Sequence, residues 1–182
     1  MSKEFDKDLY YISNEWIPLY RENMSDLIDG VCNRDPSDFR VLLQNFFRED
    51  FSNGLVGLPM RNQKIFQNPS VLNKHWYLND AFYRIEHLRQ KIPNVDLKDL
   101  GVSNSGNPFG VFIDDVFVRV NSDYQYYFSN KICKTLEGVH NPVVLEIGGG
   151  FGGTALFLKR QLNSMRMYVN LDLPETLMVA TY

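Results

Sequence analysis

VVLEIGGGFGGTALF (residues 143–157) is the stretch of this 182-residue sequence that decides the fold. A short apolar run with one acid, Glu146, breaks into five glycines within six residues and then resumes with helix-forming residues. β-Branched residues fall on both faces of the apolar run, which is typical of a buried parallel strand. The pattern predicts a strand that turns within very few residues into a helix over residues 152–162.

The glycines give this turn properties that a ligand site needs. Gly148 can take a positive φ where the strand ends, because it has no Cβ atom. Gly150 leaves the backbone bare for a ligand, and Gly152 or Gly153 lets the helix pack closely on the sheet. Unpaired N–H groups at the start of the helix attract a negative or polar group. We therefore expect a ligand-binding turn.

A second acid, Asp172, follows the glycine turn at the sequence separation expected of a ribose-binding residue. MRMYVNLDLP (residues 165–174) predicts another strand, which ends at Asp172 on the same edge of the sheet. Gly148 and Asp172 are 24 positions apart (172 − 148), which agrees with about 20 residues between such a turn and an acid that binds a ribose. A strand-helix-strand unit with a glycine-rich first turn is typical of the nucleotide-binding half of a doubly wound sheet.

Two ligand classes fit the glycine spacing. Gly148, Gly150 and Gly153 match G-x-G-x-x-G, the dinucleotide fingerprint. With Glu146 and Gly152 the turn reads E-x-G-x-G-x-G, which resembles motif I of the class I S-adenosylmethionine-dependent methyltransferases. A carboxylate here would repel a pyrophosphate but attract the amino group and sulfonium of S-adenosylmethionine. We favour the methyltransferase; the alternatives are an NAD(P)-binding oxidoreductase fragment and a non-catalytic interaction module with a decayed nucleotide fold.

A wider resemblance suggests the acceptor. GNPFG, the hairpin and Tyr-rich helix after it, and LEIGGGFGG resemble the sugar O-methyltransferases, a bacterial family associated with methylation of surface polysaccharides. LDLPET resembles the segment that carries the ribose-binding acid in small-molecule O-methyltransferases. The likeness spans residues 106–182. It implies S-adenosylmethionine as the cofactor and a hydroxyl of a sugar or polysaccharide precursor as the acceptor.

The resemblance also implies a set of cofactor-binding residues. The set is Glu146, Gly148, Gly149, Gly150, Phe151, Gly152, Asp172 and Tyr127. Tyr127 lies with Tyr124 and Tyr126 on the helix before the first strand, where a ring can face the sulfonium through cation–π attraction. The other interpretation, which we favour for these tyrosines, is that they fill the core between helix and sheet.

The N-terminal part is predicted to be mostly helical. Residues 4–30 predict two helices or one helix kinked at Pro18. In the next helix Asp35 is a cap and Pro36 the first helical residue. Its apolar face is Phe39, Leu42, Leu43 and Phe46. A longer helix opens with Asn68 as cap and Pro69 after it. Its predicted face is Val71, His75, Leu78, Phe82 and Ile85.

A hairpin and a bridging helix connect this part to the glycine turn. VFIDDVFVRV predicts two short strands around Asp114-Asp115. Ser122 and Gln125 have the spacing of a capping box, and Gly138 lies just beyond the helix.

The predicted fold class is α/β and truncated. It comprises a helical region over residues 1–110, the hairpin and bridging helix over residues 111–140, and the first β-α-β unit of a Rossmann-like methyltransferase sheet over residues 141–182. By resemblance such a sheet has seven strands, yet only ten residues follow Asp172 (182 − 172). We therefore expect the N-terminal part of a longer enzyme, or a sheet that a partner chain completes. The chain alone should bind the cofactor weakly and turn over nothing, with the catalytic base beyond residue 182.

Composition and charge limit which classes of partner and which cellular compartment we expect for this protein. The net charge of −3 and the absence of a Lys/Arg-rich face argue against a general nucleic-acid binder. No signal peptide and no apolar run of about 20 residues is present. Cys32 and Cys133 lack metal-type spacing and are expected to be reduced thiols of a cytoplasmic protein. The N-terminal helices are expected to form a lid, a platform for the acceptor sugar, or the surface of a homodimer.

Overall fold

The computed structural model describes residues 14, 17–18, 24–32, 36–52 and 68–181. Most of the helical prediction for residues 4–30, and the predicted cap Asp35, lie outside these residues. The described α-helices are α2 (Ser25–Cys32), α3 (Pro36–Gln44), α5 (Val71–Lys91), α6 (Ser122–Thr135), α7 (Gly153–Gln161) and α8 (Pro174–Thr181). Short 3₁₀ turns are η1 (Phe46–Arg48), η2 (Asp50–Ser52) and η3 (Leu97–Leu100).

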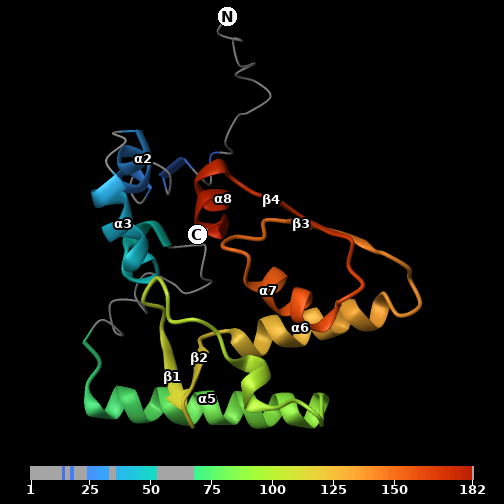
Figure 1. The fold of residues 1–182 in the computed structure, drawn as a ribbon. Coiled ribbons are helices and arrows are strands. Elements are labelled where there is room, and N and C mark those ends of the chain that lie inside the picture. The colour runs from blue at the N-terminus through green and yellow to red at the C-terminus, as the bar shows by residue number, and fades with distance from the viewer. Residues whose placement is uncertain (1–13, 15–16, 19–23, 33–35, 53–67, 182) are drawn as a thin grey trace, which may run out of the picture.

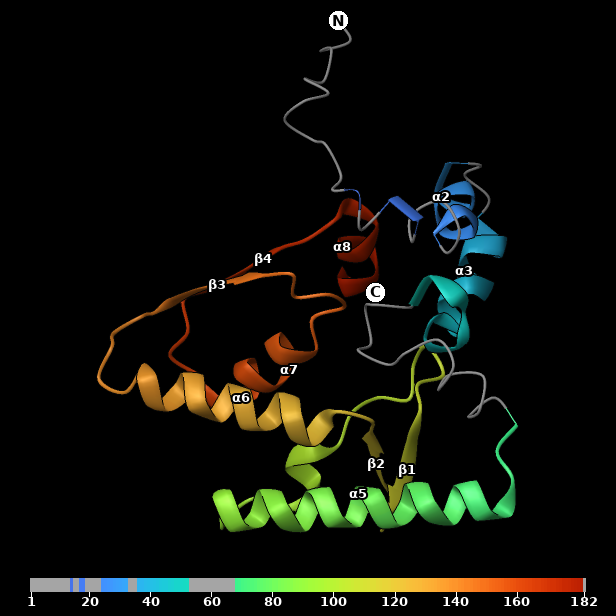
Figure 2. The same cartoon turned by 180° about the vertical axis from the view of Figure 1, so that it is seen from behind.

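The described residues form a mixed α/β structure with two separate two-stranded sheets. In Figure 1, α5 lies along one side of the molecule, and the sheet formed by β1 and β2 lies next to it. α6 and α7 follow, and the second sheet lies on the far side of α7. Both views place α8 between this second sheet and the helices α2 and α3 (Figure 2).

The first sheet is the predicted hairpin. β1 (Gly110–Ile113) pairs with β2 (Val116–Arg119) in an antiparallel register. Asp114 and Asp115 make the turn with φ angles of 45° and 65°. Two successive positive φ angles are typical of the turn type that matches the twist of a hairpin. The hairpin prediction is therefore confirmed.

The second sheet carries the glycine turn. β3 (Val143–Ile147) pairs with β4 (Met167–Leu171) in a parallel register that sets Glu146 beside Asn170. α7 begins directly after the glycines, so the predicted strand-helix-strand order is confirmed. The carboxyl ends of both strands consequently meet at one edge, next to the turn.

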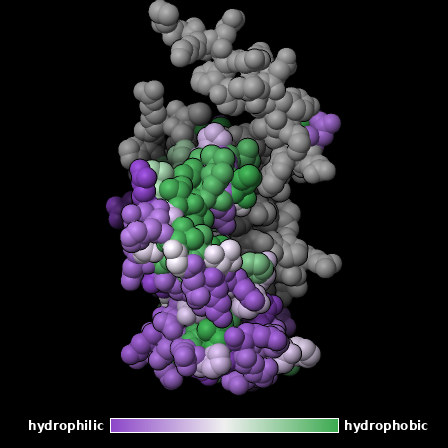
Figure 3. All heavy atoms as spheres, turned by 90° about the vertical axis from the view of Figure 1, so that its right-hand side faces the viewer, coloured by the Kyte–Doolittle hydropathy of each residue, from purple (hydrophilic) through white to green (hydrophobic). Residues whose placement is uncertain are grey.

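The expectation of a strand buried on both faces is wrong. Five apolar residues on β3 and β4 are exposed: Val143, Leu145, Ile147, Met167 and Leu171. Ile147 is 81% exposed. Figure 3 shows hydrophobic side chains gathered on this side of the molecule. Within the described residues, the exposed positions alternate along β3, whereas on β4 Met167 and Leu171 are exposed and Val169 between them is half-buried.

Two apolar clusters hold the rest of the structure together. The first joins α2, α3 and the 3₁₀ turns to α8, and its buried members are Met24, Leu27, Leu43, Phe46, Phe51 and Val179. The predicted face of α3 belongs to this cluster, since Phe39 and Leu42 pack against it. The second cluster joins α5, η3 and β2, and its buried members are Ile85, Leu88, Val95, Leu100 and Val118.

Two predicted helix starts are corrected. α5 begins at Val71 and not at Pro69, because the Ser70 side chain accepts the Asn73 N–H at 3.2 Å and caps the helix. The predicted capping box of α6 is absent, because Asn121 occupies the cap position with a φ of 67° and makes no side-chain cap. The Gln125 side chain instead accepts a hydrogen bond from Arg119.

The predicted face of α5 is also only partly correct. Ile85 is buried, whereas Val71 is 72% exposed and Phe82 is exposed as well. Ile85 and Leu88 pack with η3 and β2, whereas Tyr77 and Leu78 are only half-buried and Val71, Leu72 and Trp76 face solvent. None of the helices in the described ranges is both long and apolar enough to cross a membrane.

Candidate functional site

The turn between β3 and α7 depends on glycine conformation at alternate positions. Gly148, Gly150 and Gly152 have φ angles of 73°, 56° and 83°. Residues with a Cβ atom rarely adopt these angles, whereas glycine does so without penalty. The positive φ expected for Gly148 is therefore present, and the chain reverses from strand to helix within five residues.

Residues at the end of β4 hold this turn. The Gly149 N–H donates to Asn170 Oδ1 at 3.2 Å, and Asn170 Nδ2 donates to the Gly150 carbonyl at 3.2 Å. The Gly150 N–H donates to Asp172 Oδ2 at 2.7 Å. Two N–H groups of the turn are therefore already bound by residues at the end of β4. Asn170 was not selected from the sequence; the signal for it is its place two residues before Asp172 on the same side of the strand.

Asp172 retains capacity for a ligand in this arrangement. Its Oδ1 accepts the Leu173 N–H at 2.7 Å, and its Oδ2 accepts the Gly150 N–H. Each carboxylate oxygen has about two acceptor sites. One acceptor site therefore remains on each oxygen, which is what two neighbouring hydroxyl groups would require.

Glu146 lies against the same turn. Its Oε2 accepts the Tyr168 hydroxyl, and its carboxylate also receives a hydrogen bond from the Thr154 side chain. Partial burial raises the pKa of Glu146; the Thr154 hydrogen bond opposes this shift and the negative charge of Asp172 adds to it. The structure thus brings the two predicted acids close enough for their charges to interact.

A large cavity of the described structure lies beside the turn. Its volume is about 870 Å³. Phe151 and Gly152 line it, as do Tyr168 and Asn170 of β4. Its other walls come from α7, α8, the segment after η3, and the aromatic pair Phe46 and Phe47. Of the predicted cofactor-binding residues, Glu146, Gly148, Gly149, Gly150 and Asp172 lie beside this cavity and are not part of its lining.

Arg119 is a wall residue that the sequence analysis missed. Its guanidinium carbon lies 4.3 Å from the ring centroid of Phe151 and 5.4 Å from that of Phe47. Burial lowers its pKa to about 10, so it remains a cation at neutral pH. The sequence shows Arg119 only as the last residue of a hairpin strand, and no local pattern reveals that the chain folds Phe47 and Phe151 onto it.

Tyr127 lies elsewhere. It packs against the cluster of α5 that contains Leu88, and it lines a separate cavity of about 310 Å³ between α5 and α6. The structure therefore does not bring Tyr127 into the large cavity. Tyr126 contacts the same cluster and meets Phe157 of α7 edge to face at 6.0 Å.

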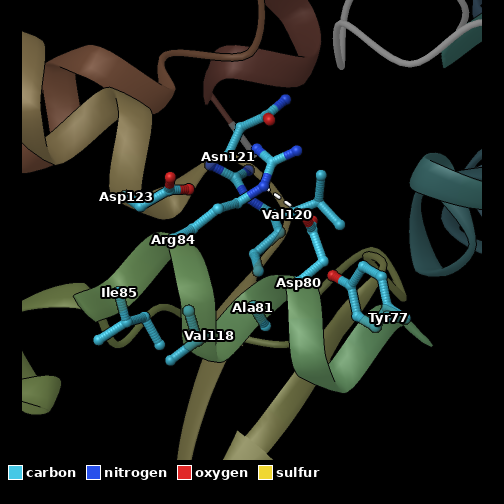
Figure 4. A pocket seen from close by; sticks show the side chains of 10 residues that line it. Tyr77, Asp80, Ala81, Arg84, Ile85, Val118, Val120, Asn121 and Asp123 are labelled. Carbon is cyan, nitrogen blue, oxygen red and sulfur yellow. Dashed lines mark hydrogen bonds and ion pairs between the residues drawn. The ribbon is translucent and has the colours of Figure 1, made fainter. Parts of the chain in front are cut away.

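A smaller cavity of about 170 Å³ separates α5 from the segment that leads from β2 into α6 (Figure 4). Asp80 and Asp123 are its acids, and Arg119 lines it as well. Asp80 is paired with Arg84 at 2.8 Å, as the dashed line in Figure 4 marks. Asp80 is therefore paired with Arg84 and not with Arg119.

Among the described residues, no group of three or more His, Cys, Asp or Glu side chains is placed to hold a metal ion. Comparison with protein-family models, with curated proteins and with solved structures finds no match to this chain.

Proposed function

We propose that this chain carries the S-adenosylmethionine-binding turn of an O-methyltransferase that acts on a hydroxyl of a sugar or polysaccharide precursor. The observation that supports the proposal most is the position of Glu146 and Asp172. They lie at or beside the ends of paired parallel strands, on either side of a turn with three positive-φ glycines. In open α/β sheets, ligands bind at the carboxyl ends of the strands.

The two acids suit opposite ends of this cofactor. Asp172 has one acceptor site left on each oxygen, which fits the two hydroxyls of a ribose. Glu146 supplies negative charge for an ammonium or sulfonium group, because opposite charges attract most strongly where water is partly excluded. A pyrophosphate at the same place would face the charge of both acids, which disfavours NAD(P).

The neighbouring cavity is a suitable place for the acceptor. Phe46 and Phe47 contribute aromatic surface from the N-terminal part, and Ser103 and Ser105 contribute hydroxyl groups. A sugar has apolar faces and polar edges, and both kinds of surface line this cavity. The turn η1, which packs against α2 and α3, would then serve as part of the platform for the acceptor. Methyl transfer is a displacement that depends on positioning the acceptor oxygen in line with the sulfonium.

A binding comparison tests the proposal. Calorimetric titration would measure the affinity for S-adenosylmethionine of the wild type, Asp172→Asn and Asp115→Asn. Loss of one charged acceptor should weaken binding about 10-fold or more in Asp172→Asn. Asp115→Asn is the matched control, because it makes the same change in an exposed hairpin turn. Equal affinity of all three proteins would contradict the proposal.

The same proteins separate the alternatives. Fluorescence of NADH that changes on mixing, with no binding of S-adenosylmethionine, would support an oxidoreductase fragment. If the wild type binds neither S-adenosylmethionine nor NADH, the non-catalytic interaction module is the remaining interpretation. Both results would overturn the proposed cofactor.

A further inference from the structure

We propose that Arg119 anchors a carboxylate group of the ligand bound beside the glycine turn, an inference that rests on the function proposed above. Arg119 is the last residue of β2 and is only 9% exposed. Its Nη2 donates to Gln125 Oε1 at 2.5 Å, whereas its Nε–H is buried and has no hydrogen-bond partner. In the described part of the chain, no Asp or Glu forms an ion pair with it.

Among the residues that the structure describes, this buried arginine has no anion beside it. A guanidinium carries five N–H donors and keeps its charge at neutral pH. Buried charges in folded proteins are nearly always paired, because removal from water is costly. The Gln125 amide oxygen supplies one neutral acceptor and no negative charge. The missing partner is therefore expected to come from a molecule that enters the cavity.

Arg119 is within reach of a ligand on the glycine turn. It lines the large cavity together with Phe151, Gly152 and Gly153. Gln125, its hydrogen-bond partner, packs against the backbone of Gly153, where an added Cβ atom would lie 2.6 Å from Gln125 Oε1. The guanidinium therefore lies one side chain away from the first residue of α7.

The charges around the cavity favour an anion. Arg119 and Lys159 are the ionisable side chains with positive charge in its lining, and no Asp or Glu from the described residues lines it. Lys159 is exposed to solvent, so Arg119 is the buried cation. The positive charge in this cavity is opposite in sign to the charges of Glu146 and Asp172 beside it. A zwitterionic ligand would therefore find a partner for its negative group in the cavity and a partner for its positive group at the two acids.

A carboxylate fits this site better than a phosphate. One buried guanidinium balances one negative charge, whereas a phosphate monoester carries up to two. A carboxylate is planar and accepts two parallel N–H bonds from the edge of a guanidinium. The rings of Phe47 and Phe151 lie near the guanidinium and would help to exclude water from that pair.

Two molecules could supply the carboxylate: the amino-acid end of the cofactor, or an acidic acceptor sugar. The first arm of the test measures dissociation constants for S-adenosylhomocysteine and for 5′-methylthioadenosine, which lacks the amino-acid end. The second arm measures the change in melting temperature with glucuronate and with glucose. Wild type, Arg119→Gln and the control Arg89→Gln are compared; Arg89 is exposed on α5.

If the cofactor supplies the carboxylate, Arg119→Gln should weaken S-adenosylhomocysteine about 10- to 100-fold and leave methylthioadenosine unchanged. If the acceptor supplies it, both nucleosides should bind wild type and Arg119→Gln alike. Glucuronate, and not glucose, should then stabilise the wild type alone. Arg89→Gln should match the wild type in every arm.

Other outcomes would overturn the inference. Binding of both nucleosides with no effect of Arg119→Gln in either arm would leave the proposed function standing and remove the carboxylate site. Failure of both nucleosides to bind the wild type would contradict the proposed function and this inference with it. Arg119→Met tests for a structural role. A buried charge without an anionic partner should be dispensable, so the melting temperature of this variant without ligand should equal or exceed that of the wild type. A lower melting temperature with unchanged ligand binding would assign Arg119 to packing.

Discussion

The Arg119 guanidinium carbon lies 4.3 Å from the centroid of the Phe151 ring. This contact joins the hairpin to the glycine-rich turn, although the two residues are far apart in the sequence. Phe47 meets Phe151 edge to face at 5.1 Å, so the helical N-terminal part joins at the same point. Three separate segments therefore meet where the ligand is proposed to bind.

Gly148 and Gly149 should respond differently to substitution. A Cβ atom on Gly149 would lie 2.6 Å from Glu146 Oε2 and closer still to Asn170 Oδ1, whereas Gly148 has open space but a φ of 73°. Gly149→Ala should cost about 1–3 kcal/mol through overpacking. Gly148→Asn should cost less, because asparagine tolerates a positive φ. Urea denaturation measures both, and equal losses would contradict this assignment.

Asn170 should stabilise the turn. Its amide accepts the Gly149 N–H and donates to the Gly150 carbonyl. Asn170→Asp removes the donor and adds a charge near Glu146 and Asp172, so it should reduce the free energy of unfolding by about 1–3 kcal/mol. Asn163→Asp, at an exposed position, makes the same change as a control. Equal unfolding midpoints for the two variants would contradict the role of Asn170.

Glu146 should make stability depend on pH. Burial raises its pKa in the folded state above the ordinary value of 4.5, so the folded chain holds this proton more tightly than the unfolded chain. The contribution is fully present below about pH 4.5 and is lost as the pH rises through the raised folded value. Glu146→Gln cannot titrate. Urea midpoints measured across this range should fall less with rising pH in the variant than in the wild type, and parallel profiles would contradict the prediction.

Substitutions on the two sides of the second sheet should change the free energy of unfolding by different amounts. Phe157 is fully buried on α7, whereas Ile147 on β3 is 81% exposed. Phe157→Ala should cost about 3–5 kcal/mol, because it leaves a cavity. Ile147→Ser should change the free energy of unfolding by only about 0.5 kcal/mol. A large loss for Ile147→Ser would mean that this face is covered in solution.

Local chemistry allowed several elements to be predicted from the sequence. The glycine-rich run predicted a strand, a turn and a helix over residues 152–162, and α7 covers Gly153–Gln161; Asp114-Asp115 predicted the hairpin. The parallel pairing of β3 with β4 followed from the spacing of apolar runs and glycines. Each of these predictions depends on φ preferences or on side-chain period, which act between near neighbours in the chain.

Only the tertiary structure decided what lies around the turn. It placed Asn170 and Asp172 on the turn's N–H groups, buried Arg119 beside the contacting rings of Phe47 and Phe151, and packed Tyr127 of α6 against the cluster on α5. It also left one face of the second sheet exposed, contrary to the expectation from β-branched residues. The physical reason is that burial and ion pairing depend on which distant segments pack together. By itself the sequence determined the local path of the chain at the glycine turn, and packing decided which charges surround it.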